Sequence, residues 1–288
     1  MSTASADLWS TVPENDEQRW EVLQRLRAID SCALLPPAAL GEHGSVREIG
    51  SHSTLPTSCR AVVDTGSATP LTVDWDVQKG VMQGVPVPEV RRVGDIRITE
   101  QRDEAGGDPA EPRDCRLTAH FPSEVLLFLD TEAAPPTDGC AVAHRLLDTA
   151  IALLATEPPH GTSPDSATTV LTGADPCAAL SPLGITPAAP AEQHIQMCVA
   201  GKDADEIVIS YNYDGERTVV ESDATTTIGA RTVYTSKFQE FYIYEFVAGS
   251  PIAPGDELFG PIVPSVSVTG RDESLVDKVT RQLFITLG

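Results

Sequence analysis

A chain of 288 residues is long enough for about two domains, each able to bury a hydrophobic core of its own. Its formal net charge of −22 excludes the basic footprint of a nucleic-acid-binding protein and disfavours adhesion to anionic lipid. Because the acidic residues are spread along the sequence, a solvated surface is their ordinary explanation.

The first 29 residues form an N-terminal extension. Residues 1–7 are polar and lack the apolar stretch of a signal peptide. Residues 14–28 predict a helix with Trp20, Leu23 and Leu26 on one face. Such a helix either packs on the domain that follows it or forms a stalk leading from a membrane anchor.

A cysteine-bracketed unit then occurs twice. The first copy opens with Asp-Ser-Cys-Ala-Leu-Leu-Pro at residues 30–36 and returns to a cysteine at Cys59. The second opens with Asp-Pro-Cys-Ala-Ala-Leu-Ser-Pro at residues 175–182 and returns at Cys198. A repeat of this length indicates two copies of one domain.

The two copies continue in parallel beyond these cysteines. Each has a polar turn, alternating runs typical of strands, and an amphipathic closing helix. The matching strand segments are 71–77 and 207–213, 93–98 and 228–233, 115–121 and 241–246, and 125–129 and 266–268. The apolar helical positions are Val142, Leu146, Leu147, Ala150, Ile151 and Leu154 in the first copy, and Leu275, Val276, Val279, Leu283 and Phe284 in the second.

These elements predict the fold class. A short helix is expected after each opening cysteine, at residues 36–40 and 182–185, followed by about five strands and the closing helix. Hairpin-type connections such as Asp214-Gly215 favour antiparallel pairing. The class is therefore α+β: two tandem copies of a disulfide-tied, mostly antiparallel sheet with a C-terminal helix packed on it. The expected division is 1–29, extension; 30–155, first repeat; 156–172, linker; 173–288, second repeat.

Six cysteines allow fifteen disulfide pairings. The duplication favours sequential pairs, namely Cys32 with Cys59, Cys115 with Cys140 and Cys177 with Cys198. Six reduced thiols of a cytosolic protein are the alternative, and a metal site is disfavoured because no Cys-x-x-Cys is present. The disulfides imply an oxidising, extracytoplasmic setting, so we expect a secreted or membrane-anchored ectodomain with its leader or anchor upstream of Met1.

Little in the sequence points to catalysis. Asp64-Thr65-Gly66 resembles the nucleophile turn of an aspartic protease, but that chemistry needs a second carboxylate, and the matching turn at residues 203–205 lacks the glycine. A hairpin turn explains the same residues. The histidines show no metal-ligand spacing. We assign no catalytic residue, metal or cofactor, and keep an aspartic-type hydrolase using Asp64 as a remote alternative.

The second copy differs from the first in its aromatic content, since it holds all five tyrosines. Aromatic side chains beside an apolar loop suit ligand or partner binding. The candidate ligand-binding residues are Tyr211, Tyr213, Tyr242, Tyr244, Leu258 and Phe259. Alternatively, aromatic packing in the second copy replaces a disulfide equivalent to Cys115–Cys140. The second copy has no such pair, since Phe241 and Ser274 stand near the equivalent positions.

The opening motif, the returning cysteine strand and the tandem arrangement resemble secreted or membrane-anchored, lipoprotein-like domains of actinobacteria, which are similar in outline to the extracellular sensor domains of their serine/threonine kinases. The resemblance implies an α+β, disulfide-tied fold outside the membrane and supplies no catalytic residues. We therefore expect a non-enzymatic binding or sensing module of the cell envelope, whose partner is an envelope ligand or a protein. A structural scaffold of the envelope is the alternative.

Overall fold

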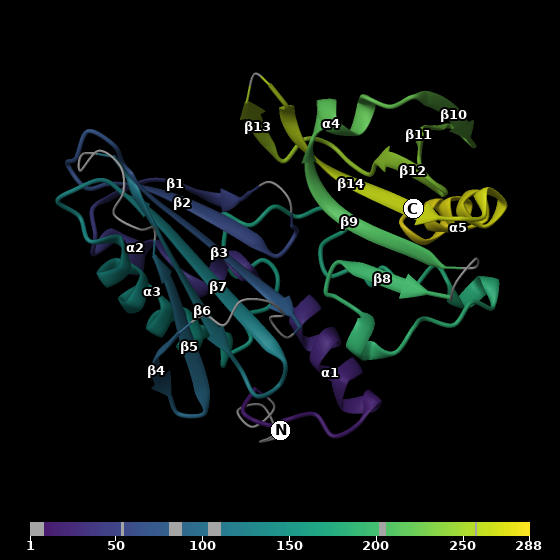
Figure 1. Cartoon of the computed structure of the whole chain (residues 1–288). Helices are drawn as coiled ribbons and strands as arrows, with labels where there is room; N and C mark the ends of the chain where they lie inside the picture. The colour runs from purple at the N-terminus through teal and green to yellow at the C-terminus, as the bar shows by residue number, and fades with distance from the viewer. Residues whose placement is uncertain (1–8, 53–54, 81–87, 103–110, 202–205, 257) are drawn as a thin grey trace. The chain divides into compact units, whose positions relative to one another are not determined.

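The computed structural model describes residues 9–52, 55–80, 88–102, 111–201, 206–256 and 258–288. The polar start at residues 1–7 and the turn at residues 203–205 lie outside the described residues. The chain divides into two compact units (Figure 1). The first unit comprises the chain up to Ser51 together with Thr57–Ser166, and the second comprises His52–Pro56 and Ala167–Gly288.

The first unit is built on a seven-stranded antiparallel sheet in the order β1-β2-β3-β7-β6-β5-β4. Its strands are β1 (Ser45–Ser51), β2 (Ser58–Asp64), β3 (Leu71–Lys79), β4 (Glu89–Val93), β5 (Ile96–Arg102), β6 (Arg113–His120) and β7 (Val125–Ala133). Its helices are α1 (Asp16–Arg27), the 3-10 turn η1 (Ser31–Leu34), α2 (Pro37–Gly41) and α3 (Gly139–Leu154).

The core of this unit lies between α3 and the sheet. The helix packs on β6 and β7, and all six apolar positions predicted for its inner face are buried. Strand β3 alternates strictly between buried and half-buried residues, as period-two patterning requires. Asp138 begins α3 because its side chain accepts a hydrogen bond from the Ala141 N–H.

The second unit has a sheet in the order β10-β11-β12-β14-β9-β8, with β13 added beside β14. Its strands are β8 (Met197–Ala200), β9 (Ile207–Gly215), β10 (Ala224–Ile228), β11 (Arg231–Phe238), β12 (Phe241–Val247), β13 (Ala253–Asp256) and β14 (Gly260–Gly270). Its helical segments are η2 (Ser181–Leu183), η3 (Pro190–Glu192), α4 (Glu216–Val220) and α5 (Glu273–Thr286). Helix α5 packs on β12 and β14.

The two units follow the same chain path, as the duplication predicts. The path β2-β3-β7-β6-β5-β4 in the first sheet is repeated as β8-β9-β14-β12-β11-β10 in the second. Each unit ends with a helix whose N-cap is an aspartate, Asp138 or Asp272. The α+β fold class with two tandem copies is therefore confirmed.

Two details of the expected fold were wrong. Within the described residues each unit has seven strands instead of about five, because edge strands such as β1 and β10 have almost no buried residues and lack the alternation by which strands are recognised. Asp214-Gly215 is also not a hairpin turn, since Gly215 ends β9 and leads into α4. A side chain at Gly215 would lie 2.5 Å from the Cβ of Phe259, which accounts for the glycine.

The predicted N-terminal helix, α1, packs within the first unit. Leu23 and Leu26 are buried, and Asn15 caps the helix by accepting from the Gln18 N–H. The segment after α3 returns to the end of α1, where Glu157 pairs with Arg25. In the part of the chain that the structure describes, no helix combines the length and the apolar character needed to cross a bilayer.

Three disulfides are present, and they are the three sequential pairs. Their Cα–Cα distances are 5.4 Å for Cys32–Cys59, 5.3 Å for Cys115–Cys140 and 5.2 Å for Cys177–Cys198, all usual for the bond. The first and third join the start of a unit to its returning strand, while the second joins β6 to the first turn of α3. Bonds of this kind indicate folding in an oxidising, extracytoplasmic compartment.

Candidate functional site

The aromatic groove expected in the second unit is not formed. Tyr211 and Tyr213 are each 1% exposed and lie on the face of β9 that also buries Ile207 and Ile209. Tyr244 is buried too, and its hydroxyl donates to Glu273 in the first turn of α5. These three tyrosines cannot line an open groove, because they pack in the interior of the unit.

The remaining candidates lie far apart. Tyr242 pairs with Gly270 at one end of β14, where the Lys237 ammonium lies 4.4 Å from the tyrosine ring centroid. Leu258 and Phe259 are exposed and precede Gly260 at the other end of that strand. An eleven-residue strand is about 33 Å long, so these residues do not share a small-molecule site.

Tyr242 and Tyr244 instead lie in β12 at the strand–helix junction, which a disulfide holds in the first unit. The strand pairing shows which residues of the two sheets are equivalent. Starting from Cys59 and following the paired residues across the first sheet leads to Leu117 in β6, and the same steps from Cys198 lead to Tyr244 in β12. Cys115, two residues before Leu117, is therefore equivalent to Tyr242, which is one residue from the expected Phe241. The strand–helix junction of the second unit is held by the Tyr244 hydrogen bond and by the edge-on contact of Phe246 with Phe284.

The first unit has a cavity beside its Cys115–Cys140 disulfide. The cavity has a volume of about 330 Å³ and lies where the end of β5, the start of β6 and the start of α3 meet. It is lined by Arg102, Arg113, Asp114, Cys115, Ala133, Pro135, Pro136, Thr137, Asp138, Gly139 and Cys140. Pockets that take small ligands begin at about this size.

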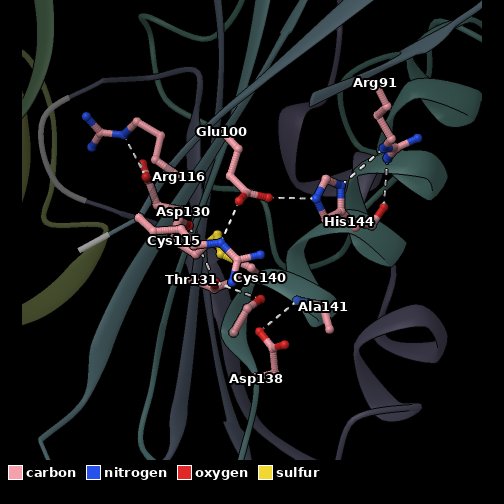
Figure 2. The surroundings of a disulfide bond; sticks show 12 residues. Arg91, Glu100, Cys115, Arg116, Asp130, Thr131, Asp138, Cys140, Ala141 and His144 are labelled. Atoms are coloured by element: carbon pink, nitrogen blue, oxygen red, sulfur yellow. Dashed lines mark hydrogen bonds and ion pairs between the residues drawn. A yellow bond between two sulfur atoms is a disulfide. The ribbon is translucent and has the colours of Figure 1, made fainter. Parts of the chain in front are cut away.

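Beside the disulfide, a chain of polar contacts fixes Glu100 and His144 (Figure 2). The Arg91 Nε donates to His144 Nδ1 at 3.1 Å, so the ring proton is on Nε2, which lies 2.8 Å from Glu100. Arg91 also pairs with Asp148 of α3 at 2.7 Å. Arginine thus sets both the tautomer and the orientation of the histidine.

Glu100 is held as a carboxylate. Hydrogen bonds from Arg102 and, to a smaller extent, from His144 lower the pKa of Glu100, and burial opposes them only in part. One of its oxygens lies within 4.8 Å of both sulfurs of the Cys115–Cys140 bond. This grouping resembles a metal triad in its distances, but disulfide sulfurs are not thiolates and do not bind metal in this state.

The sequence gives little sign of this region. The histidines show no metal-ligand spacing, although Cys140 and His144 are four residues apart on α3 and so share one face. That spacing is the only signal in the sequence for the site, because Glu100 and Arg102 come from a distant strand.

The structure gives no support to a catalytic Asp64. One oxygen of Asp64 accepts from the Gly66 N–H in the turn after β2, and the other pairs with Arg47. Hydrogen bonding, above all from Arg47, lowers the pKa of Asp64. An aspartic dyad requires a second carboxylate that raises one pKa, and among the described residues no hydrogen-bonded carboxylate partner of Asp64 is found.

Comparison with known proteins does not identify a family. No protein-family model and no curated protein matches the chain. Among solved structures, DynU16 of the dynemicin biosynthetic locus is similar at 13% identity over 96% of this chain and 92% of that chain, with a TM-score of 0.16. The di-domain ARO/CYC protein BexL from the BE-7585A biosynthetic pathway is similar at 10% identity over 90% and 89%, with a TM-score of 0.14. Scores this low carry no argument about fold or function.

Proposed function

We propose that this protein is a non-enzymatic binding module of the cell envelope that takes a small, carboxylate-bearing ligand in the cavity of its first unit. The observation that carries the proposal is the cavity itself, which has a volume of about 330 Å³ and lies at the start of the 16-residue helix α3. Two arginines, Arg102 of β5 and Arg113 of β6, line it. The expected groove in the second unit is replaced by this site.

Arg113 is the charge at the cavity that attracts an anionic group. Arg102 is paired with Glu100 at 2.5 Å, whereas Arg113 has no ion-pair partner among the described residues. The N–H groups and dipole of α3 add positive potential at the same end of the helix. Because Asp114 and Asp138 also line the cavity, a ligand with a single carboxylate fits better than a polyanion.

The disulfides support the proposed location. Three bonds and no free cysteine among the described residues suit a protein that folds outside the cytoplasm. A secreted protein and the ectodomain of an anchored one both satisfy this requirement. In either case the module meets its ligand in the envelope or outside the cell.

A titration with small carboxylates tests the proposal. The amides of Cys140 and Ala141 should shift saturably in NMR spectra when monocarboxylates of two to six carbons, with and without an amino group, are added. The shifts should vanish in Arg113→Ala and persist in Arg116→Ala, a matched control because Arg116 lies on the other face of β6, paired with Asp130. Absence of saturable shifts with every carboxylate, or equal shifts in Arg113→Ala, would rule the site out.

A scaffold role is the second candidate. Leu258 and Phe259, which are 68% and 48% exposed, form an adjacent apolar pair before β14. Exposed apolar neighbours favour protein–protein contact. If the protein is a scaffold, it self-associates in sedimentation experiments, and Leu258→Ser with Phe259→Ser makes it monomeric.

A further inference from the structure

We propose that the Cys115–Cys140 disulfide is an exchangeable bond, opened by a small thiol that carries a carboxylate and enters the adjacent cavity. The inference rests on the proposed function, because it uses the same cavity and the same Arg113. Both half-cystines line the cavity, although their exposed fractions are only 2% and 4%. A small thiol that occupies the cavity is therefore in contact with the bond.

The second unit keeps the same chain path without an equivalent of this bond. The second unit has the same strand path and the same closing helix, yet its strand–helix junction is held by Tyr244, Phe246 and α5 without a disulfide. Opening the bond in the first unit therefore removes a local link between β6 and α3. The Cys32–Cys59 bond remains to hold the start of the unit to β2.

The position of Cys140 makes its sulfur the leaving group. Cys140 is the second residue of α3, and a thiolate at a helix N-terminus is stabilised by the helix N–H groups and dipole. A thiol with a low pKa leaves faster in exchange. Glu100 opposes the new charge, but its own charge is balanced by Arg102 and by the His144 Nε2–H.

The reaction is balanced by the entering thiol. Its thiolate attacks the Cys115 sulfur, forming a mixed disulfide there and releasing Cys140 as a thiolate. A second thiolate attacks the sulfur of the bound thiol, which releases Cys115 and forms the disulfide of the small thiol. The protein bond is reduced by two electrons, and two small thiols are oxidised.

The test uses the full chain and two thiols that differ in the carboxylate. The oxidised protein is incubated at pH 8 with N-acetyl-L-cysteine or with 2-mercaptoethanol, quenched with acid, alkylated and mapped by mass spectrometry. We expect Cys115 and Cys140 to be alkylated about tenfold faster than the other four cysteines with N-acetyl-L-cysteine, and the early adduct to be on Cys115. The advantage over 2-mercaptoethanol should be lost in Arg113→Ala and kept in Arg116→Ala.

The outcomes separate this inference from the proposed function. If the three disulfides open at equal rates, or this one opens last, the exchange proposal is overturned, while saturable carboxylate binding would leave the binding function intact. If both thiols open the bond equally fast, the requirement for a carboxylate in the exchange is overturned, while the ligand class of the proposed function is decided by the NMR titration.

Discussion

Replacing Asp76 with asparagine should change how the stability of the first unit depends on pH. Asp76 lies in β3, where Thr57 and Gln78 donate hydrogen bonds to its two oxygens. Burial is the main cause that raises the pKa of Asp76 from 3.8 to about 6, against the opposing effect of these bonds. A raised carboxyl pKa means that the folded state prefers the neutral form, so stability is lost as pH rises from about 4 to about 6.

The size of the effect follows from the pKa. One pKa unit corresponds to about 1.4 kcal/mol, which gives a full linkage of about 3 kcal/mol for Asp76. Because the side chain retains some solvent contact, we expect about 2 kcal/mol. In Asp76→Asn the Thr57 bond can persist, while the amide group facing Gln78 adds a penalty that does not depend on pH. The slope with pH is therefore the diagnostic quantity, and the absolute stability is not.

Tryptophan fluorescence can measure this slope in the first unit alone, since Trp9, Trp20 and Trp75 are the only tryptophans in the sequence. Urea unfolding is followed at pH 4, 5, 6 and 7 for the wild type and Asp76→Asn. The difference in unfolding free energy should move by about 2 kcal/mol in favour of the variant between pH 4 and 7. Thr57→Val, which removes a bond to the ionised form, should steepen the wild-type slope. A difference that stays constant across this range would refute the reasoning.

Three further changes test the two junctions and the second sheet. Replacing Cys115 and Cys140 together by alanine opens a loop spanning 25 residues and should lower the stability of the first unit by about 3.5 kcal/mol in tryptophan-monitored unfolding, without unfolding it. Tyr244→Phe should lower the unfolding free energy of the second unit by about 1 kcal/mol in tyrosine-monitored unfolding. Tyr242→Phe should lower it little, because the Tyr242 hydroxyl is exposed. Burial, and secondarily a nearby aspartate, raises the pKa of Glu245 to about 7. The wild-type second unit should therefore lose stability as the pH rises from about 4.5 to about 7, and Glu245→Gln should abolish this loss in the same assay.

Local patterning was sufficient to predict most of the fold. The spacing of Val142, Leu146 and Ala150 identifies the buried face of α3 whatever surrounds it, because helical periodicity depends only on the sequence. The disulfide pairs followed from the duplication, since Cys32–Cys59 and Cys177–Cys198 occupy equivalent places in two copies of one chain path. Edge strands were missed because neither face of such a strand has to be apolar.

The binding residues could not be predicted in the same way. Alternation along β12 places Tyr242, Tyr244 and Phe246 on one face and Phe241 and Ile243 on the other, but it does not say which face meets α5. The structure shows that the tyrosine face meets the helix, because the Tyr244 hydroxyl reaches the first turn of α5 and Phe246 contacts Phe284. Which face is buried is decided by tertiary packing, and no local pattern records it.

The divergence of the two copies indicates where a ligand site can persist. Because Leu117 and Tyr244 hold equivalent positions in the two copies, the residue equivalent to Arg113 in the second copy is Glu240. Glu240 forms an ion pair with Arg271 at 3.2 Å. At this corner the second unit therefore has the reversed charge, already neutralised, and a tyrosine in place of the half-cystine. A carboxylate that is attracted to Arg113 gains nothing at Glu240. We therefore expect a carboxylate-bearing ligand to prefer the first copy, where Arg113 and the Cys115–Cys140 disulfide line the cavity.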